Sequence, residues 1–239
     1  MELNILVDFD NIAQRDRSRG LVYISEKILD RLGCDELLPY KRVKIRFYGG
    51  WYEQNNVTNR AQLLQSEIQS NFPRRINIID NQQGLFHSVI GYAELSYSLV
   101  IDPQHHLFST YRSRGMPSGL YCEHPSSLGC SNINCPLIYI HDFINNGRCT
   151  NQCCNIKPKD MIHRGEQKLV DTMVISDLLY LASQKTSLLC IVSSDDDFWP
   201  GIETAVLMGS KVIHVHTKNR ATPIEYCQNI GSNYLQNIL

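Results

Sequence analysis

Short apolar runs alternate with helical patterns near both ends of the chain. Ile5-Leu6-Val7 and Leu188–Val192 are apolar and rich in β-branched residues, which is typical of buried strands. Val43–Tyr48 alternates apolar with polar positions, and Ile76–Ile79 is a further short strand. With helices between them, these strands predict an α/β fold in which a mostly parallel, Rossmann-like sheet is flanked by helices.

Apolar residues at helical spacing predict the helices that cover this sheet. The segments are Val22–Leu32, Asn59–Phe72 and Lys168–Ser183, and a further helix opens at Pro200 because proline is tolerated in a first turn. Lys211–His216 is predicted as a late strand. One more helix is predicted at the C-terminus from a four-residue apolar spacing: Tyr226, Ile230, Tyr234 and Ile238.

The pattern of strands and helices is interrupted between residues 81 and 164. This segment holds six of the nine cysteines, several His, Pro and Gly residues, and two short predicted strands, Tyr92–Ile101 and Leu137–His141. A structureless loop of this length is uncommon inside a compact domain. We therefore predict a Cys/His-rich insert over 81–164 and a main domain formed by 1–80 and 165–239.

The overall composition is that of a globular protein, with 239 residues, 43% of them hydrophobic and 20% charged. A formal net charge of −1 excludes a general polyanion binder, so any nucleic-acid contact must come from local basic patches. The N-terminus has no basic leader, and no apolar run reaches the ~18 residues of a membrane span. A cytoplasmic protein without membrane contact is expected.

Acidic side chains follow two of the predicted strands directly. Asp8 and Asp10 come after the first strand, and Asp195-Asp196-Asp197 come after Leu188–Val192. The carboxyl ends of parallel strands meet at one edge of a sheet, so these acids are expected to share a crevice. The alternative for the late group is helix capping, for which one or two Asp residues would suffice.

Two more acids lie in the predicted helix Lys168–Ser183. Asp171 shares a helix face with Ile175 and Leu178, which predicts a position on the buried stripe. Asp177 is flanked by apolar residues as well. Carboxylates that converge without positive partners form a site for a hard cation such as Mg²⁺ or Mn²⁺, which can activate water and neutralise phosphate charge in a displacement.

Three short motifs occur in order along the main domain. The first strand runs into Asp8-Phe9-Asp10-Asn11, the pattern Asp-x-x-Asn. Lys168-Leu169-Val170-Asp171, with Asp177 six residues on, is close to Lys-Gly-Val-Asp followed by a second Asp. Ser193-Ser194-Asp195-Asp196-Asp197-Phe198 is close to Ser-Gly-Asp-Ser-Asp-Phe. Together the motifs resemble the NYN domain of the LabA-like, PIN-like superfamily of metal-dependent ribonucleases.

This resemblance implies a PIN-like fold and an endoribonuclease that uses Mg²⁺ or Mn²⁺. The implied metal ligands are Asp8, Asp171, Asp195 and Asp197, and Asn11 would position the site or the scissile phosphate. The implied substrate is RNA, in particular single-stranded RNA, and single-stranded DNA is a further candidate. Leu169 and Ser194 depart from the pattern, which has glycine at both positions.

Two other functions stay open on the sequence. A haloacid-dehalogenase-like phosphatase also has Asp-x-Asp after its first strand, with Asp8 then the nucleophile and Asp10 the acid and base. Phosphatases of this type usually have Thr or Val four positions after the first Asp, but this chain has Ile12 at that position. A catalytically inactive nucleic-acid-binding or regulatory module could retain the same acids.

The cysteines of the insert predict a structural zinc ion. Thiolates and imidazoles at short separations in a cytoplasmic chain favour tetrahedral Zn²⁺ over disulfides, and a small subdomain needs such a staple. The predicted ligands are Cys130, Cys135, Cys149 and Cys153, with Cys122 and His124 in reserve. The remaining thiols in regular elements are expected in the core: Cys34, Cys190 and Cys227.

Basic side chains near the acids predict contacts to nucleic acid. The candidates are Arg15, Arg17 and Arg19, which follow the first acidic motif, and Lys168, which opens the second. Trp51, Tyr52, Tyr111 and Tyr121 are candidates for stacking on bases. The insert is expected to serve folding or substrate recognition, and to be the surface for a protein partner or a second copy of the chain.

Overall fold

A computed structural model of the protein describes residues 2–80, 85–149, 151, 153–218 and 230–239. The chain forms two compact units: a main unit, Met1–Tyr111 with Gln167–Leu239, and an insert unit, Arg112–Glu166. The insert was predicted from residue 81. The compact insert unit begins only at Arg112, because the segment after residue 84 contributes a strand to the sheet of the main unit.

A seven-stranded sheet forms the centre of the main unit, in the order β11-β10-β9-β1-β2-β6-β5. The strands are β1 (Glu2–Asp8), β2 (Arg42–Tyr48), β5 (Arg74–Asp80), β6 (Leu85–Leu95), β9 (Leu188–Val192), β10 (Lys211–His216) and β11 (Tyr234–Ile238). Every pairing is parallel except that of β5 with β6. The prediction of an α/β fold with a mostly parallel sheet is therefore confirmed.

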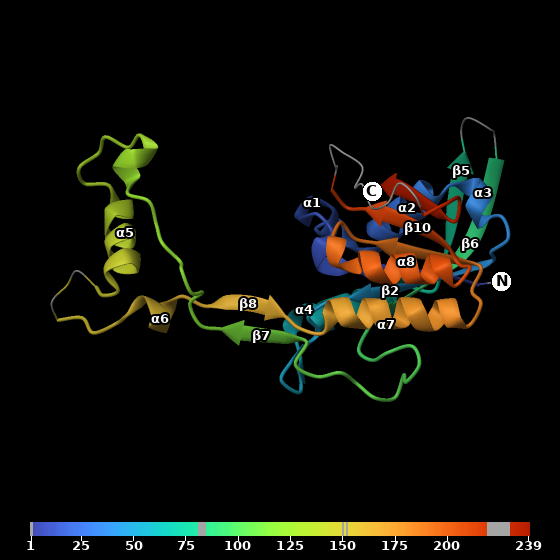
Figure 1. Cartoon of the computed structure of the whole chain (residues 1–239), viewed down its shortest axis with the longest axis horizontal. Coiled ribbons are helices and arrows are strands. Elements are labelled where there is room, and N and C mark those ends of the chain that lie inside the picture. Colours follow the sequence, from blue (N-terminus) through green and yellow to red (C-terminus); the bar gives the residue numbers. More distant parts are fainter. Residues whose placement is uncertain (1, 81–84, 150, 152, 219–229) are drawn as a thin grey trace. The chain divides into compact units, whose positions relative to one another are not determined.

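Helices cover both faces of this sheet (Figure 1). α2 (Gly20–Leu32), α3 (Cys34–Leu37) and α4 (Asn59–Asn71) pack on one face, and α7 (Val170–Ser183) and α8 (Trp199–Leu207) pack on the other. Because β9 is buried on both faces, all of its residues are apolar. No helix in the described residues is long and apolar enough to cross a membrane.

The remaining elements are short. The chain reaches and leaves the insert unit through β7 (Tyr111–Arg114) and β8 (Arg164–Gln167), which are neighbours in a second sheet with β3 (Tyr52–Glu53) and β4 (Asn56–Val57). The insert unit contains α5 (Pro136–Asn146) and α6 (Pro158–Met161). The other pieces are α1 (Gln14–Arg17) and the 3₁₀ turns η1 (Phe9–Asn11), η2 (Pro125–Leu128) and η3 (Asp196–Phe198).

Two predicted elements are wrong in type. Leu137–His141, predicted as a strand from its β-branched and aromatic residues, lies in α5, which starts with a proline in its first turn and ends at Gly147 with φ 72°. The C-terminal helix is instead β11, because a four-residue apolar spacing also places Tyr234 and Ile238 on one face of a strand. The Tyr226 part of that prediction lies outside the described residues. Of Tyr92–Ile101, only the first four residues are strand.

Candidate active site

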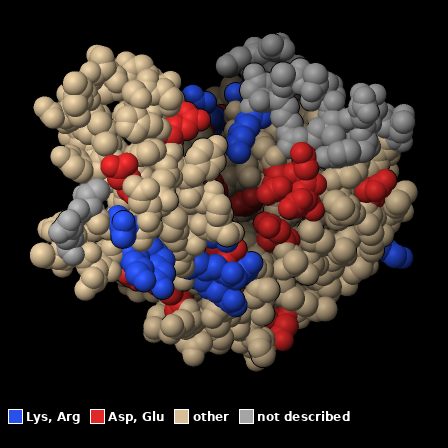
Figure 2. Space-filling model, turned by 60° about the vertical axis from the view of Figure 1, so that its left-hand side comes forward, with Lys and Arg blue, Asp and Glu red and all other residues tan. Residues whose placement is uncertain are grey.

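The carboxyl ends of three neighbouring strands bring the predicted acids to one edge of the sheet. Val7 of β1 pairs with Val192 of β9, which pairs with Val215 of β10. The residues that follow these positions therefore meet, as the parallel order requires. Asp8 is only 6% exposed at this edge, and acidic side chains gather on one face of the molecule (Figure 2).

Ser193 links the acids from the two strands. Its hydroxyl donates to Asp8 Oδ2 at 3.1 Å and accepts from the backbone N–H of Asp195, also at 3.1 Å. Its carbonyl oxygen lies 2.9 Å from Nε2 of the buried His214. The position of Asp8 relative to Asp195 is thus fixed by a completely buried serine that the third sequence motif contains.

Asn11 performs a similar function for the backbone around the site. Its side-chain oxygen accepts from the N–H of Ser194 at 3.0 Å and from the hydroxyl of Thr217 at 2.5 Å. These two partners follow β9 and β10, so one amide oxygen holds the ends of three strands together. This arrangement is consistent with the positioning role that the resemblance implies for Asn11.

The acids at this edge repel one another. Burial raises the pKa of Asp8 from its usual 3.8 to about 6, and the negative charges of Asp171 and Asp10 act in the same direction, against the hydrogen bond from Ser193. Partial burial also raises the pKa of Asp171, as do the charges of Asp195 and Asp197. We call Asp8, Asp171, Asp195 and Asp197 the acid cluster. Among the described residues, none of the four forms a salt bridge.

Asp195 has a capping role as well as a place in the cluster. Its Oδ1 accepts from the backbone N–H of Asp197 at 3.1 Å, which caps η3. The capping interpretation is therefore confirmed for Asp195, and its role as a metal ligand stays a prediction. Its neighbour Asp196 is exposed.

One of the two acids of α7, Asp171, differs from its predicted position, whereas Asp177 is buried as predicted. Asp171 is exposed, because the buried stripe of the helix runs instead through Val170, Val174 and Asp177. Asp177 is completely buried and accepts from Tyr48 Oη at 2.6 Å and from the N–H of Val100 at 2.7 Å. Its Oδ2 also lies 3.3 Å from Nε of the buried Arg46, so Asp177 belongs to a structural ion-pair network.

The predicted basic contacts have different surroundings. Arg17 pairs with Asp10 at 3.0 Å, whereas the guanidinium of Arg19 lies 3.5 Å from the centre of the Tyr23 ring. Arg15 is exposed. The backbone N–H of Lys168 donates to the carbonyl of Thr110 at 2.9 Å, which fixes the chain just before α7.

Arg60 joins Asp10 as well, and it was missed in the sequence. The available signal was its position as the second residue of α4, where a cation is opposed by the helix dipole. Asp10 is therefore paired with two arginines and is not one of the acid cluster.

Two of the four aromatic residues predicted to stack on bases are buried, and Tyr121 is exposed. Trp51 is completely inaccessible, and its indole N–H donates to the carbonyl of Phe47 at 3.0 Å. Tyr52 is 6% exposed. Neither ring presents a free face to a base, so this prediction is wrong for both residues.

The chemistry of the acid cluster fits a hard cation. No group of three or more His, Cys, Asp or Glu side chains in the described part of the chain is arranged closely enough to enclose a metal ion. Mg²⁺ does not require such a cage, since it is usually held by one or two carboxylates and retains several waters. Four carboxylates that form no salt bridge among the described residues, two of them with raised pKa values, are oxygen donors of the kind it selects.

The backbone at Leu169 shows why the motif pattern has glycine at this position. Leu169 has φ 66°, in the left-handed region where glycine is favoured, and its side chain is 47% exposed. The glycine of the Lys-Gly-Val-Asp pattern is therefore the residue that this position suits best.

We expect Leu169→Gly to leave the free energy of unfolding unchanged or to raise it by up to about 1 kcal/mol, because relief of strain exceeds the entropy of glycine. Leu63→Gly, on the exposed face of α4, is the matched control and should lower it by about 1 kcal/mol. Urea denaturation of both variants measures the difference. Equal losses would show that the Leu169 side chain, not its backbone, determines stability here.

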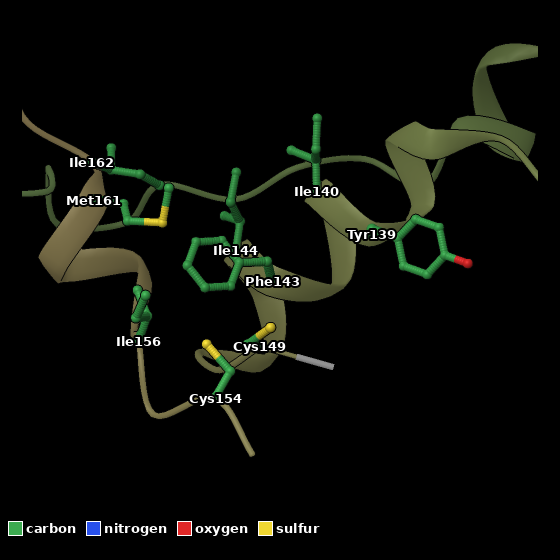
Figure 3. Close-up of a pocket in the computed structure, with 9 residues that line it drawn as sticks. All are labelled: Tyr139, Ile140, Phe143, Ile144, Cys149, Cys154, Ile156, Met161 and Ile162. Carbon is green, nitrogen blue, oxygen red and sulfur yellow. The ribbon is translucent and has the colours of Figure 1, made fainter. Parts of the chain in front are cut away.

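The cysteines of the insert unit are all free thiols. Cys135 is buried and Cys153 is exposed, while Cys149 and Cys154 line one apolar pocket of about 510 Å³ (Figure 3). α5, which forms one wall of this pocket, buries none of its residues. The predicted zinc ligands Cys130, Cys135, Cys149 and Cys153 stay a prediction.

Two thiols of the main unit are core residues, as predicted. Cys34 and Cys190 are buried, and burial raises the pKa of the Cys190 thiol. Cys227 lies outside the described residues.

No protein-family model, curated protein or solved structure matches this chain.

Proposed function

We propose that this protein is a metal-dependent ribonuclease that hydrolyses phosphodiester bonds of single-stranded RNA at the acid cluster. The observation that carries the proposal is the cluster itself. Carboxylates from β1, α7 and the loop after β9 influence one another at one edge of the sheet, and no salt bridge in the described residues offsets their charge. Such an arrangement is unfavourable unless it binds a cation.

The sequence motifs support the same proposal. The resemblance to the NYN domain rests on three motifs whose acids lie in this cluster, with Asp177 as the exception. The left-handed backbone at Leu169 is what a motif glycine would require. A PIN-like fold for the main unit and a zinc-stapled insert unit that contributes to recognition or to a protein contact belong to the same proposal.

The residues of the chain would divide the chemistry as follows. Asp8, Asp171, Asp195 and Asp197 would hold Mg²⁺ or Mn²⁺, which supplies an activated water and neutralises charge on the scissile phosphate. Asp8 is ionised above pH 6, and Ser193 holds its carboxylate in place. Asn11 keeps the three strand ends in register around the phosphate.

Cleavage of labelled single-stranded RNA with a panel of divalent cations tests the proposal. We expect product with Mg²⁺ or Mn²⁺, none with EDTA, and loss of product in Asp195→Asn. Asp196→Asn is the matched control, because the motif resemblance assigns no metal-ligand role to Asp196. Cleavage that persists in EDTA or in Asp195→Asn contradicts the proposal.

Two other results would favour the alternatives. RNA binding without product under Mn²⁺ would support an inactive binding module. Release of inorganic phosphate from small phosphoesters would support a phosphatase. Single-stranded DNA and duplex RNA in the same assay define the substrate class.

A further inference from the structure

Asp10 lies beside the acid cluster but is surrounded by positive charge. Its Oδ1 accepts from Arg17 Nη1 at 3.0 Å and from Arg60 Nη2. Asp10 follows Asp8 by two residues across η1, and two residues span at most about 7 Å of chain. The two arginines therefore border the cluster without neutralising it.

Buried aromatic rings contact the guanidinium groups of both arginines. The guanidinium of Arg60 lies 4.7 Å from the centre of the Phe9 ring and 5.6 Å from that of Trp51, and Arg17 lies 5.9 Å from Phe9. Phe9 is 3% exposed and Trp51 is inaccessible, so this support is rigid. Cation–π contacts and the shared carboxylate together hold both guanidinium groups in one orientation.

The charges around Asp10 are unbalanced in favour of an anion. Two guanidinium groups pair with this one carboxylate, so Asp10 alone does not balance their charge. Arg60 is in the first turn of α4, a thirteen-residue helix whose dipole also attracts negative charge at this end. The Arg60 side chain is 42% exposed, and in the described residues Asp10 engages one of its nitrogens. The remaining donors of its planar fork suit a phosphate group.

We propose that Arg17 and Arg60, oriented by Asp10, form a phosphate clamp that binds the RNA backbone next to the bond hydrolysed at the acid cluster. The proposal rests on the ribonuclease function and deepens it. Asp10 is a positioning residue here, and Arg60 is the residue that contacts substrate. A single-stranded RNA that follows the clamp presents its neighbouring phosphate to Asp8.

Binding of labelled single-stranded RNA over a range of salt concentrations tests the clamp, with Asp8→Asn as the background so that RNA is not cut. Arg60→Ala should raise Kd about tenfold and reduce the slope of log K against log salt by about 0.7, the value for one phosphate contact with a single strand. Arg60→Lys keeps the charge and should restore most of the slope. Arg42→Ala is the control and should match the unmutated background, because Arg42 begins β2 and lies at the opposite end of the strands from the acid cluster.

In otherwise unmutated protein, Arg60→Ala should raise KM while kcat changes less than twofold. The clamp is contradicted if Arg60→Ala binds RNA with the Kd and salt slope of Arg42→Ala, both being folded by circular dichroism. Failure of the proposed function has a different signature: no variant cuts RNA, although Arg60→Ala still weakens its binding.

Discussion

Asp8→Asn is expected to lower the rate of RNA cleavage by at least about 100-fold without unfolding the protein. Asparagine has the shape of aspartate, and its side-chain oxygen can still accept from Ser193. The substitution therefore removes a charge from the acid cluster and little else. Single-turnover cleavage at saturating Mn²⁺ measures the effect, with Asp196→Asn as the control.

The stability of the same variant gives an independent readout. Because folding raises the pKa of Asp8 from 3.8 to about 6, ionisation of Asp8 opposes folding in metal-free protein. Its contribution therefore falls as pH rises from 3.8 to about 6, and the loss is complete above that range. Asp8→Asn has no carboxylate at this position, so its free energy of unfolding does not include this loss.

In EDTA at pH 7.5 we expect Asp8→Asn to exceed the unmutated protein in free energy of unfolding by about 1–3 kcal/mol, with a smaller difference near pH 4. Urea denaturation at the two pH values measures this. A variant that is inactive and also less stable at pH 7.5 would show that Asp8 has a structural role.

Asp177→Ala should lower the free energy of unfolding by about 3–5 kcal/mol, because it removes one of the two carboxylates paired with the buried Arg46 and leaves buried donors without an acceptor. Arg46 is 6% exposed and lies 3.3 Å from Asp177. The same change removes the acceptor for Tyr48 Oη and for the N–H of Val100. Urea denaturation at pH 7.5 gives the magnitude.

Two matched variants separate the parts of this network. Tyr48→Phe removes one hydrogen bond and should lower the free energy of unfolding by about 1–2 kcal/mol. Asp177→Asn keeps an acceptor for Val100 and should fall between the other two. If Asp177→Ala stayed within about 1 kcal/mol of the unmutated protein but lost cleavage, Asp177 would belong to the active site, as its motif position suggests.

The central strands could be predicted because burial leaves a clear pattern in their residues. β1 and β9 have helices on both faces, and their short apolar runs reflect that. β11 is at the edge of the sheet, where Tyr234 is buried and Leu235 is 37% exposed. An edge strand needs fewer apolar residues, so its spacing resembled that of a helix.

The convergence of Asp8 and Asp195 at one edge of the sheet was also predictable, since parallel strands determine where their ends meet. Which face of α7 is buried could not be predicted exactly. One helical residue turns by about 100°, so a small error in the position of the buried stripe is enough to place the exposed Asp171 on it. Arg60 could not be associated with Asp10 from the sequence, because 50 residues separate them and only the docking of α4 brings them together.

The position of β1 between β2 and β9 also has a consequence during protein synthesis. β2 can pair with β1 soon after both leave the ribosome, but Ser193 follows Asp8 by 185 residues. At about 5–20 residues per second, the ribosome needs on the order of 10–40 s to synthesise that interval. Any function that needs Asp8 and Ser193 together can therefore begin only after this interval has been synthesised.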